Sequence, residues 1–176
     1  MLPDPPTPGC MLYCAIGVPT GSVVPTPAGW TLIQRVTGVD NDLLIYVVYD
    51  NTSISQFSSA ASPPYGNFAA VIAEVQGPAG SPLDINYPFA GLAPVGFTDV
   101  RPPTAATNPE IVLLAAETGA EGVSRVSNYS PIAFGFQPGV YVSLYARFLA
   151  TPIAPNGVLV FDTATVFEYS VTSYHQ

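Results

Sequence analysis

Proline and glycine recur along the whole chain, and this punctuation most limits what the chain can fold into. The 176 residues include 20 prolines and 15 glycines. Both residues disfavour helix interiors, and no stretch longer than about a dozen residues shows a helical period. Between the breaks lie short runs rich in Val, Ile, Leu, Tyr and Phe. Short strands separated by turn signals are typical of an all-β protein.

The apolar runs predict a single antiparallel β-sandwich, jelly-roll-like, over residues 10–176. Residues 43–50, LLIYVVYD, are almost continuously apolar, as expected for a central strand. Residues 139–150 alternate in polarity, which predicts a half-buried strand. The predicted strands cover residues 10–18, 30–37, 43–50, 67–77, 111–119, 139–150, 156–161 and 163–174.

Two Pro-rich segments lie outside these strands. Residues 1–9, MLPDPPTPG, read as an extended arm of polyproline type, with Pro3, Pro5 and Pro6 as candidate contacts. Residues 78–110 form a long irregular region, in which we expect short edge strands near 83–87 and 95–100. A connection this long usually has a function or packs as an ordered cover.

Charge is scarce, and this excludes some partners. Charged residues make up 9% of the chain, against about 25% in an ordinary soluble domain. There is no lysine, and four arginines oppose twelve acids for a net charge of −8. Phosphate backbones and anionic membranes attract clustered Lys and Arg, so we expect neither nucleic acid nor membrane as a partner. The N-terminal residues also lack the basic region of a signal peptide.

The cysteines do not indicate a disulfide or a metal site. Cys10 and Cys14 lie in a predicted strand on one face. Four residues of strand span about 13 Å, too far for a bridge. The C-x3-C spacing has no second cysteine pair, and the sole histidine is His175 at the C-terminal end. We therefore expect two small buried apolar side chains and no metal.

Several acidic and aromatic residues have two interpretations each. Trp30 follows a Pro-x-Gly turn and is either a packing residue or a contact for a glycan. The oxygens of Asp40, Asn41, Asp42 and Asp50 either shape turns or bind Ca²⁺. Glu74, Glu117 and Glu168 occupy strand-like segments. A glycosidase would need two of them in a cleft, whereas a strand glutamate ordinarily faces solvent or pairs with an arginine such as Arg147.

We expect no catalytic residues and no cofactor, so the chain is predicted not to be an enzyme. A Ser-His-Asp triad needs a supported histidine, and a phosphate-binding P-loop needs a lysine. Aromatic residues in Pro-rich loops are instead good interface material, although they can also fold back as a cover. The candidate interface residues of this kind are Tyr65, Tyr87, Phe89, Phe97 and Tyr129.

The order of the sequence blocks resembles a group of β-sandwich domains encoded in bacteriophage and prophage genomes. The blocks are PAGWTLIQRV, LLIYVVYD, FAAVIAEVQGPAGSPLD and PTAATNPEIVLLAAE, and the similarity spans roughly residues 10–172. One departure is that Val75 and Gln76 stand where such domains usually carry tyrosine and arginine before the glycine of the third block. Any role that this arginine has in such domains is therefore absent from this chain.

The resemblance implies a virion structural protein that assembles in the host cytoplasm. A capsid decoration or auxiliary head protein is the preferred role, because no shaft-forming repeat is present for a long fibre. The alternative is an adhesin module of a tail or fibre that binds host-surface glycan. The implied partners are the major capsid protein or tail components, together with further copies of this chain in a trimer or another cyclic oligomer.

Removal of residues 1–9 tests the role of the arm. We expect the shortened protein to fold, because the predicted strands begin at residue 10, and to lose its attachment to the particle. Circular dichroism checks folding, and quantitative blotting of purified particles checks incorporation. Full incorporation of the shortened chain would contradict the role of the arm.

Overall fold

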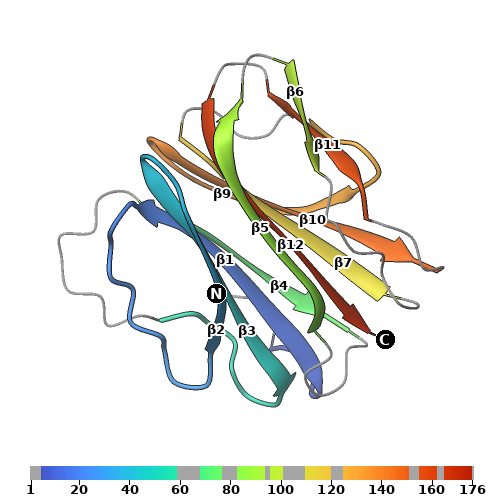
Figure 1. The fold of residues 1–176 in the computed structure, drawn as a ribbon. Helices are drawn as coiled ribbons and strands as arrows, with labels where there is room; N and C mark the ends of the chain where they lie inside the picture. The colour runs from blue at the N-terminus through green and yellow to red at the C-terminus, as the bar shows by residue number, and fades with distance from the viewer. Residues whose placement is uncertain are drawn as a thin grey trace.

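The computed structural model describes residues 5–58, 68–76, 83–93, 96–100, 110–119, 125–150, 155–161 and 165–175. All regular secondary structure in these residues is β-strand, which confirms the predicted all-β class (Figure 1). The strands are β1 (Cys10–Pro19), β2 (Thr31–Thr37), β3 (Asn41–Asn51), β4 (Ala69–Val75), β5 (Leu83–Ala93), β6 (Gly96–Val100), β7 (Glu110–Thr118), β8 (Arg125–Val126), β9 (Ser130–Gln137), β10 (Val140–Leu149), β11 (Gly157–Phe161) and β12 (Thr165–His175).

The strands form three antiparallel sheets. A four-stranded sheet has the order β2-β3-β1-β4, and a five-stranded sheet has the order β5-β12-β7-β10-β9. A small three-stranded sheet has the order β6-β11-β8. Every pairing between neighbouring strands is antiparallel. The jelly-roll-like connectivity stays a prediction.

The five-stranded sheet is the middle layer and has an apolar cluster on each face (Figure 1). Leu113 and Leu144 of this sheet meet Ile45 of the four-stranded sheet in one cluster. Leu114 and Tyr169 meet Leu159 of the three-stranded sheet in the other. Alternate residues of one strand therefore serve different cores, because successive side chains point to opposite faces.

The two central strands of the four-stranded sheet, β1 and β3, are also buried on both faces. From Asn41 to Val48 every residue of β3 is buried, which confirms that the apolar run 43–50 is a central strand. One face of β3 packs on the five-stranded sheet. The other face is covered by residues from loops, which are Val24, Trp30, Ile54 and Phe57.

The cysteines lie in this loop-covered cluster. Cys10 and Cys14 are 2% and 0% exposed, and both thiols are free. The prediction of two small buried apolar side chains is confirmed. Burial raises the pKa of both thiols, because an apolar environment disfavours the thiolate.

Strand β10 shows where the prediction of half-burial was wrong. Val142 and Leu144 face the first core as expected, but Ser143 and Tyr145 on the other face are buried as well. Tyr145 belongs to the cluster beneath the three-stranded sheet. Sequence alternation revealed the two faces of the strand, but it could not reveal that a third sheet covers the more polar one.

The predicted irregular region 78–110 contains more strand than expected. Residues 83–93 form β5, an eleven-residue strand paired with β12 along most of its length. Residues 96–100 form β6, which pairs with β11. The edge strands predicted near 83–87 and 95–100 are thus both present. The first is longer than predicted, because pairing with the long β12 overrides the local effect of Pro88. The other residues of the region lie outside the described part of the chain.

Strand β9 was not predicted at all. Its sequence, SPIAFGFQ, contains Pro131 and Gly135, which lower strand propensity. It forms an edge of the five-stranded sheet, where a proline is tolerated. Gly135 also serves packing, because a Cβ at this position would lie 2.6 Å from the backbone oxygen of Ala70 in β4.

Substitution of Gly135 by alanine tests the close approach of β9 to β4. We expect the Gly135→Ala variant to lose about 1–3 kcal/mol of unfolding free energy, because the added methyl group meets rigid backbone. Denaturant unfolding measures this change. The control Gln137→Ala alters an exposed side chain of the same strand and should stay within about 0.5 kcal/mol of the native chain. Equal stability of the two variants would contradict the close approach.

Candidate functional site

Strand β9 is an edge strand of the five-stranded sheet, and at Gly135 it lies close to the backbone of Ala70 in β4. Among the described strands it forms its ladder with β10 alone. An edge strand presents unpaired backbone N–H and C=O groups to any strand that approaches it. Natural edge strands are commonly protected by charged side chains, but β9 contains no charged residue.

Three exposed apolar side chains accompany this edge. We call Ile132, Phe134 and Phe136 the β9 apolar row, and they are 44%, 64% and 57% exposed. Phe134 and Phe136 lie opposite Ser143 and Tyr141 of β10. They therefore share the sheet face that the three-stranded sheet covers elsewhere. Their rings contact Tyr145 and Tyr141, with centroid distances of 5.9 and 4.6 Å.

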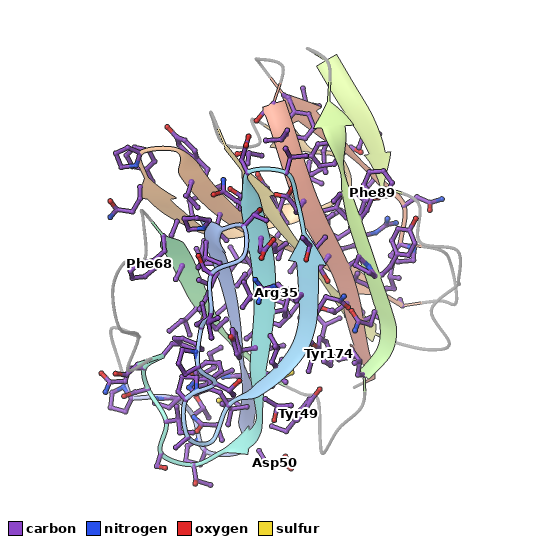
Figure 2. All side chains as sticks on the ribbon, turned by 60° about the vertical axis from the view of Figure 1, so that its left-hand side comes forward. Arg35, Tyr49, Asp50, Phe68, Phe89 and Tyr174 are labelled. Atoms are coloured by element: carbon purple, nitrogen blue, oxygen red, sulfur yellow. The ribbon has the colours of Figure 1, made fainter. Side chains whose placement is uncertain are left out.

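The opposite edge of the same sheet is β5, which carries two of the predicted interface residues. Phe89 is 40% exposed and stacks on Tyr169, with ring centroids 5.2 Å apart. Tyr87 is half-buried, and the centroid of its ring lies 6.3 Å from that of Tyr169. Figure 2 shows Phe68, which precedes β4, and Phe89 on opposite sides of the molecule. The two predicted interface residues, Tyr87 and Phe89, thus lie in a strand and not in a loop.

Of the remaining predicted aromatic residues, only the side chain of Tyr129 is described. Tyr129 is 8% exposed, and its hydroxyl donates a hydrogen bond of 2.7 Å to the Pro155 carbonyl. Its placement fits the covering interpretation. Phe97 lies in β6, and only its backbone is described. Tyr65 lies outside the described residues.

Trp30 is a packing residue. It is 6% exposed, and its Nε1–H donates to the Gln56 carbonyl at 3.2 Å. Its ring meets Phe57 edge-on at a centroid distance of 5.3 Å. An indole with so little exposed surface offers no face for stacking on a sugar, so the glycan interpretation has no support in its geometry.

The described part of the Pro-rich arm lies against its own domain. The Thr7 amide donates to both carboxylate oxygens of Glu74, at 3.2 and 3.3 Å. These hydrogen bonds lower the pKa of Glu74. The Gly9 amide donates to the Asn51 carbonyl at 2.8 Å. Pro5 is exposed and Pro6 half-buried; Pro3 lies outside the described residues.

A second notable group is polar and buried. Glu117 of β7 and Glu168 of β12 are direct cross-strand partners. They are 0% and 1% exposed. We call them the carboxyl pair. The Asn41 side chain donates to Glu117 Oε1 at 3.0 Å and to the Gly139 carbonyl at 3.2 Å. The pair thus lies between the two larger sheets, where β7 and β12 meet the start of β3.

The environment of the carboxyl pair favours the neutral acid. Burial, and then Glu168, raise the pKa of Glu117 to about 10. Burial also raises the pKa of Glu168. The expectation that these glutamates face solvent or pair with Arg147 was wrong. Arg147 donates to the Asn156 carbonyl at 3.0 Å instead.

This geometry does not form a glycosidase site. Glycoside hydrolysis needs two acids that a sugar can reach. Glu117 and Glu168 are both buried within the core. Glu74 belongs to β4, in the other sheet, and holds the arm. The sequence identified the three glutamates, but only the strand register brings two of them together.

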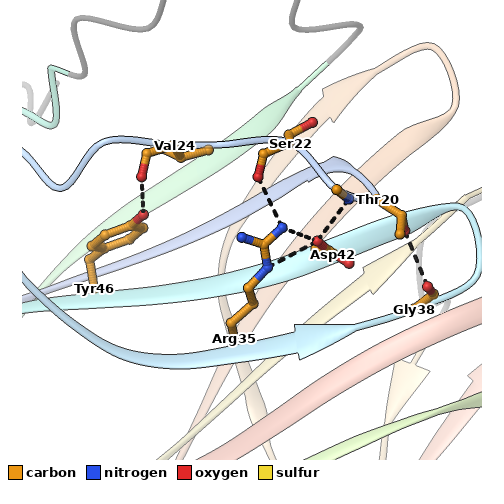
Figure 3. A network of polar contacts seen from close by, with 8 residues as sticks. Thr20, Ser22, Val24, Arg35, Gly38, Asp42 and Tyr46 are labelled. Carbon is orange, nitrogen blue, oxygen red and sulfur yellow. Dashed lines mark hydrogen bonds and ion pairs between the residues drawn. The ribbon is translucent and has the colours of Figure 1, made fainter.

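Two of the aspartates considered as Ca²⁺ ligands have described surroundings. Asp42 is fully buried and binds Arg35 through its Oδ2 atom, with Arg35 Nε at 3.0 Å (Figure 3). The Gly21 amide also donates to this oxygen at 3.3 Å. Asp50 has a positive φ of 47° at the far end of β3. Within the described residues, no three His, Cys, Asp or Glu side chains gather closely enough to hold a metal ion.

No protein family model, curated protein or solved structure matches this chain. In the described ranges, no helix is long and apolar enough to cross a membrane.

The ion pair between Arg35 and the buried Asp42 should stabilise the fold. We expect the Arg35→Ala variant to lose about 1.5–3 kcal/mol of unfolding free energy, because a buried carboxylate loses charged hydrogen-bond donors. Thermal and urea denaturation measure this loss. The control Arg147→Ala removes an arginine whose hydrogen bond to a carbonyl is exposed, and its effect should be smaller. An Arg35→Ala variant as stable as this control would contradict the role of the ion pair.

Proposed function

We propose that this protein is a non-enzymatic structural component of a bacteriophage particle that assembles through apolar contacts. The observation that carries the proposal is the β9 apolar row, which lies exposed along an uncharged edge strand. The occupant that we propose for this edge is the β9 edge of a second copy. Pairing would continue the five-stranded sheet across the contact, with backbone hydrogen bonds between the two edge strands.

The physical character of the surface supports contact by burial and not by ion pairs. Interface cores are enriched in aromatic residues and depleted of charge, as the β9 apolar row is. The whole chain has four cationic residues, and two of them, Arg35 and Arg147, already bind groups of their own chain. Concentrating apolar contact on an edge without acids also avoids repulsion between copies that each carry a charge of −8.

We propose a phage particle because of the resemblance of the sequence blocks to phage-encoded domains. The ordered blocks from PAGWTLIQRV to PTAATNPEIVLLAAE are its support. A capsid decoration role, a jelly-roll-like sandwich and a Pro-rich arm that reaches the major capsid protein belong to the same proposal. Glycan binding by a tail adhesin is the weaker alternative, because Trp30 is buried.

Replacing the exposed phenylalanines of β9 tests the contact surface. We expect the double variant Phe134→Ser, Phe136→Ser to dissociate into monomers at concentrations where the native chain is oligomeric, because truncating buried aromatic anchors commonly weakens binding tenfold or more. Sedimentation velocity measures the oligomeric state. Circular dichroism confirms that the variant is folded.

The matched control is Phe89→Ser, which alters an exposed aromatic residue on the opposite edge strand. This variant should assemble like the native chain. If it dissociates while the β9 variant stays oligomeric, the contact lies at β5 instead. A native chain that is monomeric at all concentrations would contradict self-assembly through β9.

Electron microscopy tests whether the protein is part of a phage particle and where it lies. Antibody labelling of particles released from cells that carry the gene should place the protein over the head in a regular lattice. Label confined to the tail would favour the adhesin alternative. Absence of the protein from purified particles would overturn the virion proposal, whatever the oligomeric state in solution.

A further inference from the structure

Among the described residues, no cation pairs with either glutamate of the carboxyl pair. Glu117 and Glu168 lie opposite each other on neighbouring strands, so their side chains project from the same face of the sheet. On each glutamate the Oε2 atom is buried and has no hydrogen-bond partner. The donor that Glu117 does have is the neutral amide of Asn41. Two carboxylates so close together in a dry site cannot both ionise at low cost.

Glycines let the pair reach across to the four-stranded sheet. A Cβ at Gly17 of β1 would lie 2.7 Å from Glu117 Cγ. A Cβ at Gly38, in the turn before β3, would overlap the Glu168 carboxyl group. The absence of side chains at both glycines therefore makes the room that the two glutamates fill. The pair belongs to the contact between the two larger sheets and is not a surface feature.

The charged neighbours make ionisation of the pair still less favourable. Asp40 disfavours the charged form of both glutamates, and Asp42 adds to this effect at Glu168. The guanidinium of Arg35 binds Asp42 and not the pair. The other neighbours of the pair that the described residues show carry no charge. They are Gly17, Gly38, Asn41, Val142 opposite Glu117 on β10, and Ala90 opposite Glu168 on β5.

We propose that the carboxyl pair is a proton-dependent latch between the five-stranded and four-stranded sheets. While the pair holds a proton, one neutral acid lies beside one carboxylate, and the sheets stay closed. When the proton leaves, two anions face each other in the core and the contact loosens. The proposal is independent of the phage particle and of the β9 apolar row.

The sign of the pH dependence follows from the direction of the shift. The pKa of each glutamate is raised in the folded chain relative to its ordinary value. The folded chain therefore binds more protons than the unfolded chain above the ordinary carboxyl range. The stability that the proton supplies is fully present in acid and is lost as the pH rises toward the folded pKa. A carboxylate that has a partner in the folded chain usually has a lowered pKa, and the stability that it supplies is lost as the pH falls.

The experiment follows unfolding of the full chain from about pH 5 to about pH 8. For one proton, the folding equilibrium constant should fall about tenfold per pH unit over this range. The Glu117→Gln variant keeps the shape of the neutral acid and removes one of the two titrating groups, so its slope should be smaller than that of the native chain. Glu74→Gln is the matched control, because it removes one acid from an exposed site of the other sheet, and it should keep the slope.

Infrared spectroscopy tests the proton without relying on a variant that folds. The native chain at neutral pH should show the carbonyl stretching band of a protonated carboxyl group, and this band should disappear in strong alkali. Absence of the band at neutral pH would overturn the latch. Equal slopes for Glu117→Gln and Glu74→Gln would also overturn it. So would stabilisation of the native chain by millimolar Ca²⁺ at about pH 8 that Glu117→Gln abolishes, because a cation would then neutralise the pair.

Discussion

The face-to-face packing of the four-stranded sheet on the five-stranded sheet is the interaction on which the rest of the structure depends. Ile45, Leu113 and Leu144 belong to the cluster between these sheets and are fully buried. Burying apolar surface is the main favourable term in folding, and β-strands can bury two faces only when layers cover both. The third sheet and the loop around Trp30 supply those outer layers. A core in several layers needs many apolar residues and few charged ones, which agrees with the composition of the chain.

The same packing places polar groups where they acquire unusual properties. Glu168, Ser170 and Thr172 share the face of β12 that points to the four-stranded sheet, and all three are buried. The Thr172 hydroxyl donates to the Tyr13 hydroxyl at 3.4 Å across the contact. A polar group in a core has to find a partner or stay neutral. This requirement links the strand register to the protonation of Glu117 and Glu168.

The exposed edge at β9 is the other consequence of the layered arrangement. The three-stranded sheet packs on Leu114, Tyr145 and Tyr169, whereas Phe134 and Phe136 remain exposed. Sheet edges in soluble proteins are usually covered, charged or bent away from solvent. An edge that is uncharged and aromatic is therefore a surface suited to assembly, in a chain whose surface offers few ion pairs.

The sequence by itself determined the all-β class, the central strand at residues 43–50 and the burial of Cys10 and Cys14, because these follow from local composition and a period of two. It did not reveal β9, in which Pro131 and Gly135 suggest a break and an edge position permits a strand. It marked Glu117 and Glu168 separately, since nothing local predicts that residues 51 positions apart become cross-strand partners. Only the tertiary structure decided which faces are covered, which acids meet and which aromatic residues stay exposed, because each depends on strand register and on the neighbouring layer.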